Sequence, residues 1–139
     1  MVLPQPGEPT ADIKELAALA DSVAAEYDSQ MAAVQFSRAL EAIWRFISAA
    51  NRLVETSKPW VLAKDESRQQ ELASVMYALA ESLRITSALL WPFMPAKCEA
   101  LRAQLNCGPL APPFKVKWGE LEPGTRVAKG EPLFPKLLE

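Results

Sequence analysis

The feature that most constrains this chain is an apolar pattern of helical period in its first half. Between residues 36 and 54, apolar side chains recur every three or four positions: Phe36, Leu40, Ile43, Ile47, Ala50 and Val54. This spacing places them on one face of an α-helix. Pro59 then ends the helix, because proline donates no backbone hydrogen bond and disfavours helical conformation in the residue before it. We therefore expect a helix over 36–57, then a corner at Pro59 and Trp60, where Pro59 can start one helical turn.

Three other segments have the same period. One follows Thr10, a good N-cap, and extends to about residue 31. A second begins at Asp65 and ends at Pro92, and its late part is apolar nearly all round, which predicts a central helix. A shorter one opens at Pro95 and closes near residues 106–108. These patterns predict an all-α fold, a bundle of about four helices, with Trp44 and Trp91 in its core.

The two ends of the chain lack this period. Residues 1–9 hold three prolines and read as an extended linker, so we expect the bundle to occupy 10–107. Residues 108–139 are predicted to form an irregular, proline-rich C-terminal tail packed on the bundle. Its expected apolar anchors are Trp118, Leu121, Val127, Leu133 and Phe134. A short β pairing near 114–117 or 125–128 is also expected.

Composition excludes several function classes. The chain has no His, the commonest general base, and its five Gly form no phosphate-binding loop, which favours a binding or scaffold module over a self-contained enzyme. Cys98 and Cys107 cannot supply the roughly four ligands of a zinc site, so we expect free thiols, no metal and no cofactor in this chain. No apolar run is long enough to span a membrane and no signal peptide is evident, which predicts a cytoplasmic protein without a membrane partner.

The segment that leads to Trp60 is the most basic of the helical segments. Between residues 38 and 64, five basic residues stand against two acidic ones; the basic ones are Arg38, Arg45, Arg52, Lys58 and Lys64. Several are candidate phosphate contacts, although a charged helix face is usually just solvated. Trp60 is either an exposed aromatic platform or a buried corner plug. Asn51, at the edge of the apolar stripe, is either a semi-buried side chain bonded to a neighbouring helix or a support for the corner.

Ordered motifs over almost the whole chain resemble one protein family. They are the run 36–44 (Phe-Ser-Arg-Ala-Leu-Glu-Ala-Ile-Trp), Ala50-Asn51-Arg52, Pro59-Trp60, the run 79–85 followed by Pro92-Phe93-Met94-Pro95, Trp118-Gly119, Pro123-Gly124-Thr125, and Glu131-Pro132-Leu133-Phe134-Pro135. In this order they resemble the anticodon-binding domain of bacterial-type methionyl-tRNA synthetases, which are class I aminoacyl-tRNA synthetases.

The resemblance implies a helical bundle that follows a catalytic domain in the same parent chain and recognises the CAU anticodon loop of tRNA-Met. It implies that Trp60, in its Pro59-Trp60 motif, contacts the splayed anticodon bases, with Asn51, Arg52, Lys58 and Arg45 as accompanying tRNA-binding candidates. Unpaired RNA bases are commonly recognised by stacking on aromatic side chains. The parent would be an ATP-dependent methionine–tRNA ligase whose ATP and methionine sites lie in the catalytic domain.

The chain also departs from the family pattern. It opens after an earlier helix of the family's domain that carries an Asn and an Arg used on the anticodon, so we expect a fragment truncated at its N-terminal side. Such a fragment is expected to be non-catalytic, to bind tRNA weakly, and to leave an apolar groove open. The alternatives are the anticodon-binding bundle of another class I synthetase, for valine, isoleucine, leucine or cysteine, and a helical protein–protein interaction module.

Overall fold

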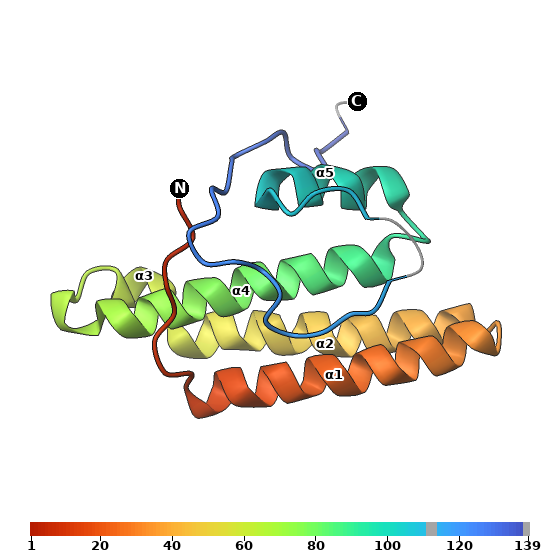
Figure 1. Cartoon of the computed structure of the whole chain (residues 1–139), viewed down its shortest axis with the longest axis horizontal. Helices are drawn as coiled ribbons and strands as arrows, with labels where there is room; N and C mark the ends of the chain where they lie inside the picture. Colours follow the sequence, from red (N-terminus) through yellow and green to blue (C-terminus); the bar gives the residue numbers. More distant parts are fainter. Residues whose placement is uncertain (111–113, 138–139) are drawn as a thin grey trace.

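The structure is a computed structural model that describes residues 1–110 and 114–137. Its described part contains four long helices: α1 (Ala11–Ala32), α2 (Phe36–Ser57), α4 (Gln69–Leu90) and α5 (Pro95–Leu105). A single turn, α3 (Pro59–Leu62), and a 3-10 turn, η1 (Glu66–Arg68), connect α2 to α4. The expected all-α bundle with an irregular proline-rich tail is confirmed (Figure 1). The expected tail also includes 111–113 and 138–139, which lie outside the described residues.

Local chemistry explains where the helices begin and end. The Thr10 hydroxyl accepts a hydrogen bond from the Ile13 N–H at 3.3 Å, which caps α1 as expected. Asp65, expected to cap the third helix, caps η1 instead through the Ser67 N–H at 3.0 Å, and α4 begins three residues later than expected, at Gln69. Helix α5 ends at Asn106, which adopts the left-handed conformation that asparagine tolerates.

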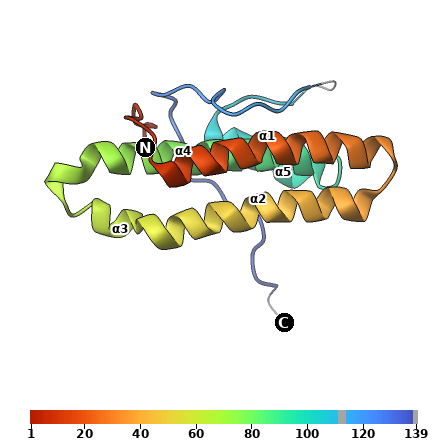
Figure 2. The ribbon, with the colours of Figure 1, turned by 90° about the horizontal axis from the view of Figure 1, so that it is seen from below.

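Helix α4 is the central element, as its all-round apolar pattern predicts. It packs against α1, α2, α3 and α5, while α1 and α2 lie antiparallel beside each other (Figure 2). The main core draws its large side chains from α1, α2 and α4, while α5 contributes Cys98; its fully buried members include Val23, Ile43, Phe46, Val75, Ile85 and Leu89. A second small cluster joins Leu3, Ala80, Leu105 and Leu121.

Two core expectations are wrong. Trp44 is 53% exposed, because the buried face of α2 is centred on Ala42 and Phe46, and Trp44 lies on the opposite side of the helix. Phe36, the first member of the apolar stripe expected on α2, is 48% exposed. Trp91 is half-buried against the core and donates its indole N–H to Glu99 at 2.8 Å.

The lead-in 1–9, expected to be a linker, packs on the molecule. Leu3 is buried, donates its N–H to the Thr125 carbonyl at 2.8 Å, and accepts from the Gly124 N–H at 2.8 Å. The expected β pairing at 125–128 is reduced to one isolated bridge, between Val2 and Arg126. Residues 1–3 and 124–127 therefore hold each other beside α4.

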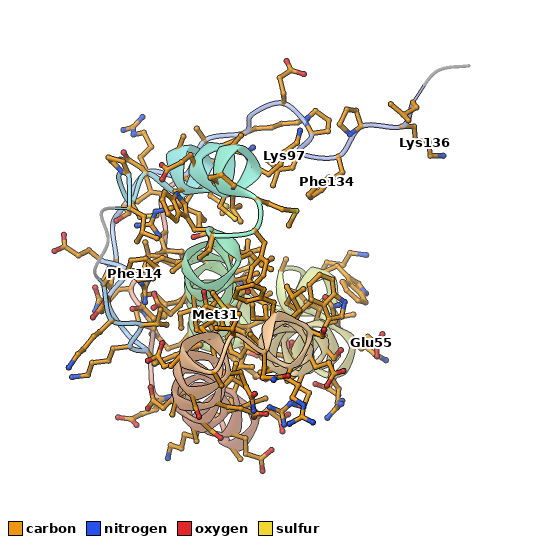
Figure 3. All side chains as sticks on the ribbon, turned by 90° about the vertical axis from the view of Figure 1, so that its right-hand side faces the viewer. Met31, Glu55, Lys97, Phe114, Phe134 and Lys136 are labelled. Carbon is orange, nitrogen blue, oxygen red and sulfur yellow. The ribbon has the colours of Figure 1, made fainter. Side chains whose placement is uncertain are left out.

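The tail is anchored by some of its expected apolar residues. Leu121 is buried and Trp118 packs against the core. Phe134 does not serve as an anchor, because it is 67% exposed and lies under the Lys97 ammonium, 5.6 Å from the ring centroid (Figure 3).

Candidate nucleic-acid interface

A sharp change of direction between α2 and α3 presents Trp60. Lys58 follows the last residue of α2 in the left-handed conformation, with φ 47°, and donates its N–H to the Val54 carbonyl at 3.0 Å. Pro59 then occupies the first position of α3, where its missing N–H costs nothing. As a result Trp60 points away from the bundle and is 56% exposed.

The turn that carries Trp60 is held firmly from below. Leu62, two residues on, is fully buried in the main core. The Gln69 side-chain amide donates to the backbone carbonyls of Leu62, at 3.3 Å, and Asp65, at 2.9 Å. Hydrogen bonds from the Ser67 hydroxyl and N–H to the Asp65 carboxylate hold the pKa of Asp65 below its ordinary value. These contacts fix the backbone of the turn that presents the exposed indole, and an exposed aromatic side chain on a fixed backbone suits a stacking platform.

Two basic side chains flank Trp60 along the chain. Lys58 and Lys64 are both exposed, and neither forms an ion pair with any described residue. Arg68, further along, is already paired with Glu71 at 2.9 Å. Val61, beside Trp60, is 47% exposed and adds apolar surface. The sequence pattern did not single out Val61, although its place next to Trp60 on the same short turn was a usable signal.

The structure separates Asn51 from Arg52. Asn51 is exposed, and its side chain makes no hydrogen bond to another described residue, so it is neither the expected semi-buried side chain bonded to a neighbouring helix nor a hydrogen-bonded support for the corner. It borders a cavity of about 340 Å³ between α2 and α4, lined mainly by apolar side chains such as Ile47, Val54 and Leu79. Arg52 turns to the other side of α2, where it lines a cavity of about 160 Å³ beside Asp12 and Glu15 of α1.

Arg45 lies further from Trp60 and has a partner. Its guanidinium pairs with the Glu26 carboxylate of α1, and both side chains are exposed. The structure therefore brings together Lys58, Pro59 and Trp60 at one corner, with Asn51 and Arg52 on diverging faces of α2. Arg45 belongs to the α1–α2 surface.

The described residues offer little for other chemistry. No group of three or more Cys, Asp and Glu side chains among them is placed to hold a metal ion. Both cysteines are free, and burial raises the pKa of the Cys98 and Cys107 thiols. Within the same residues, no helix combines the length and apolar character needed to cross a bilayer.

Comparison with known proteins gives a consistent result. The family model described as the anticodon binding domain of methionyl tRNA ligase matches residues 3–139. The methionine–tRNA ligase of Caldanaerobacter subterraneus subsp. tengcongensis is 40% identical over 137 residues, covering 98% of this chain and 22% of that protein. The Bacillus subtilis ligase is 42% identical over 128 residues, covering 88% of this chain and 19% of that protein.

Solved structures agree with the sequence relatives. The apo form of Mycobacterium tuberculosis methionyl-tRNA synthetase has a TM-score of 0.87 at 29% identity, over 99% of this chain and 28% of that one. The same enzyme bound by methionyl-adenylate has a TM-score of 0.85 at 30% identity, over 96% and 27% of the two chains. The chain thus spans about a fifth of the length of the curated relatives it matches.

Proposed function

The chain belongs to the family of anticodon-binding domains of methionyl-tRNA ligases, and from this premise we propose that it recognises the CAU anticodon loop of tRNA-Met through the Trp60 corner. The observation that carries the proposal is the half-exposed indole of Trp60 on a turn anchored by the buried Leu62. Unpaired bases of an RNA loop stack on such a platform. Lys58 and Lys64, both exposed on the turn that carries Trp60, supply positive charge for the flanking phosphates, whereas Arg52 lies on the side of α2 that faces α1.

The same proposal extends to the longer ligase. In it, the domain positions tRNA-Met in the cytoplasm for a catalytic part that uses ATP and methionine, and this part lies outside the present chain. The Mycobacterium tuberculosis enzyme bound by methionyl-adenylate extends well beyond the matched region, since this chain covers 27% of it, which leaves room for such a catalytic part. The bundles of sister class I synthetases and a protein-only interaction module are less favoured, because the relatives matched over nearly the whole chain are methionine–tRNA ligases.

Binding of anticodon stem-loops tests the proposal. Stacking contributes about 1–3 kcal/mol per base, so Trp60→Ala should weaken binding of a CAU stem-loop by about 5- to 150-fold. Trp44→Ala is a matched control, because Trp44 is a similarly exposed tryptophan elsewhere on the domain and should change the affinity by less than about twofold. Stem-loops with other anticodons should bind more weakly than CAU. Equal losses in the two variants, or equal affinity for all anticodons, would contradict the proposal.

A second experiment places the result in the intact ligase. There, Trp60→Ala should lower the rate of tRNA-Met charging while methionine activation, measured without tRNA, stays unchanged. A variant that loses both activities equally would show that Trp60 supports the fold of the enzyme instead of contacting the anticodon.

A further inference from the structure

A hollow of about 460 Å³ opens beside the turn that carries Trp60. It lies between the lead-in, α3 and the first turns of α4, which meet at one end of the bundle (Figure 1). Its walls are mainly apolar and come from all three segments, with Pro4, Pro59, Ala63, Leu72 and Met76 among them. Because Pro59 precedes Trp60 directly, the hollow and the exposed indole adjoin each other.

The walls of the hollow are held in place on both sides. On the side of the lead-in, Leu3 is buried, and its backbone is bonded to Thr125 and Gly124 at 2.8 Å. On the side of α3, the buried Leu62 anchors the turn, and the Ala63 N–H donates to the Pro59 carbonyl at 2.9 Å. Ligand pockets are usually preformed in this way, since a ligand that enters fixed walls does not have to order them.

The chemistry of the hollow suits a nucleobase better than a phosphate group. Among the described residues, no acidic or basic side chain lines it. Phosphates are bound by basic side chains or by N–H and O–H donors. Lys58 and Lys64, which could bind them, are exposed residues outside the hollow. Apolar walls instead cover the faces of an extruded base, as in enzymes that take a base out of its stack.

Gln69 gives the hollow one polar group. Its side-chain NH₂ donates to the Leu62 carbonyl at 3.3 Å and to the Asp65 carbonyl at 2.9 Å. Because both partners are acceptors, the amide must turn its NH₂ toward them, and its Oε1 is the free end. No described residue donates a hydrogen bond to this oxygen. A free acceptor matches the amino group of cytosine or adenine and opposes the O4 carbonyl of uracil.

The hollow and the indole are close enough to be used by one RNA loop. The Cα atoms of Pro59 and Trp60, as chain neighbours, are about 3.8 Å apart. Successive side chains on a helix point about 100° apart, so the two features lie on adjacent faces of α3. Bases of a single-stranded loop splay outward and can be bound separately. Two neighbouring bases can therefore occupy the indole and the hollow at the same time.

We propose that the hollow is a base pocket for one amino-bearing base of the CAU loop, cytosine or adenine, while a neighbouring base stacks on Trp60. Gln69 Oε1 accepts a hydrogen bond from the amino group, which makes Gln69 a residue that selects the anticodon. The inference rests on the proposed function, because it places the same loop at the same corner.

A double-mutant cycle between protein and RNA tests the hydrogen bond. The protein change is Gln69→Met, which keeps the length of the side chain and removes its amide. The RNA change removes one amino group, by replacing cytosine with uracil or adenine with purine. At the base in the hollow, this removal should weaken binding to the native chain by about 2- to 10-fold and make no difference to Gln69→Met.

The cycle also separates selection from support of the turn. Loss of the Gln69 bonds to Leu62 and Asp65 would weaken binding of every stem-loop alike, so only the discrimination between paired RNAs reports a contact with the base. Loss of discrimination at one of the two bases identifies that base as the occupant. If Gln69→Met discriminates at both bases as the native chain does, the proposal is overturned.

A second variant fills the hollow and leaves Gln69 intact. Ala63→Leu places three further carbons at an exposed position of its wall and should weaken CAU binding by about fivefold or more. Ala25→Leu, at an exposed alanine of α1, is the matched control and should leave the affinity unchanged. Urea unfolding checks that both variants keep the fold. Native affinity in a folded Ala63→Leu variant would show that no base enters the hollow.

Trp60→Ala distinguishes failure of this proposal from failure of the proposed function. If Trp60→Ala weakens CAU binding while Gln69→Met keeps its discrimination and Ala63→Leu its affinity, the corner binds RNA and the hollow does not. That result overturns the base pocket alone. If CAU binds no better than other anticodons and Trp60→Ala has no effect, the proposed function fails, and the base pocket fails with it.

Discussion

The Trp60 corner and the side of α4 that the tail covers, which we call the tail side, differ in what they expose and bury. The corner exposes a large apolar side chain, whereas the tail side buries a charged one. At the corner, the backbone of Lys58 and Pro59 directs a large apolar side chain into solvent, and one buried residue, Leu62, holds the turn in place. On α4, a buried carboxylate fixes an irregular stretch of tail that has no regular hydrogen-bond ladder of its own.

The structure of the tail side depends on the carboxylate of Glu81. Its side chain is fully buried, and its carboxylate accepts hydrogen bonds from Arg84 Nε at 2.9 Å, the Leu121 N–H at 2.9 Å and the Gly119 N–H at 3.3 Å. Arg84 in turn donates to the Lys117 carbonyl at 2.7 Å. In an irregular segment, backbone N–H and C=O groups that no helix or strand pairs must find side-chain partners. The Glu81–Arg84 ion pair provides them for the Gly119 and Leu121 N–H groups and for the Lys117 carbonyl. The comparison indicates that the tail side should be sensitive to single polar changes, whereas the corner should tolerate loss of its exposed group.

The largest effect should follow removal of the buried carboxylate. Glu81→Ala leaves the Arg84 guanidinium buried without its main partner and frees two tail N–H groups, which should lower the free energy of unfolding by about 3–5 kcal/mol. Urea denaturation monitored by circular dichroism measures the change. Glu120→Ala is the control, because Glu120 contacts the same arginine at 3.5 Å from an exposed position and should cost less than about 0.5 kcal/mol. Similar losses in the two variants would show that the burial of Glu81 is not what matters.

A slightly smaller effect should separate two neighbours on α3. Leu62→Ala opens a cavity under the turn and should cost about 2–5 kcal/mol, while Trp60→Ala, at an exposed position, should change the free energy of unfolding by less than about 0.5 kcal/mol. Both should weaken binding of the CAU stem-loop, Leu62→Ala because its platform is no longer fixed. Thermal and urea unfolding measure the first difference. If the two substitutions destabilise equally, Trp60 is a packing residue and the corner resembles the rest of the core.

The sequence predicted the helices well because their periods are local. Helix α2 begins and ends at the expected residues, since its apolar stripe and Pro59 define both limits within one segment. The corner and its proline turn were predicted for the same reason. Trp44 was misplaced because a tryptophan next to an apolar stripe resembles a core residue, and only packing against α1 and α4 decides which face is covered.

The tail side could not be predicted in this way. Glu81 and Arg84 stand three residues apart on a helix, a spacing that usually marks a solvated surface pair. The tail segment that buries them lies nearly 40 residues further along the chain and has no periodic apolar pattern. No local sequence pattern therefore predicts the contact. The pairing of Leu3 with Gly124 and Thr125 was missed for the same reason.

A third prediction concerns the edge of the tail side. The Tyr77 hydroxyl donates to the Leu121 carbonyl at 2.7 Å, so Tyr77→Phe should cost about 0.5–1.5 kcal/mol. Burial, and then the charge of Glu81, raise the pKa of Tyr77 above its ordinary value of 10.0. A raised folded pKa means that this contribution is fully present below pH 10 and is lost as pH rises through the folded value. The difference in unfolding free energy between the native chain and Tyr77→Phe should therefore be constant from pH 7 to 9 and shrink above pH 10. A difference that grows above pH 10 would contradict the assigned hydrogen bond.

The smallest expected effect concerns the free energy that the left-handed backbone of Lys58 costs the fold. Lys58 holds the left-handed conformation at the end of α2, where glycine is the favoured residue, so Lys58→Gly should stabilise the chain by about 0.5–1 kcal/mol. The same change should weaken binding of the CAU stem-loop by a few fold and reduce its salt dependence, because one phosphate contact is lost. Asn106→Gly is the matched control, since Asn106 ends α5 with nearly the same φ, 54°, away from the corner. It should stabilise slightly and leave RNA binding and its salt dependence unchanged. If both variants bind the stem-loop like the native chain, the lysine at the corner has no part in RNA recognition, and the contrast between the two regions rests on Trp60 alone.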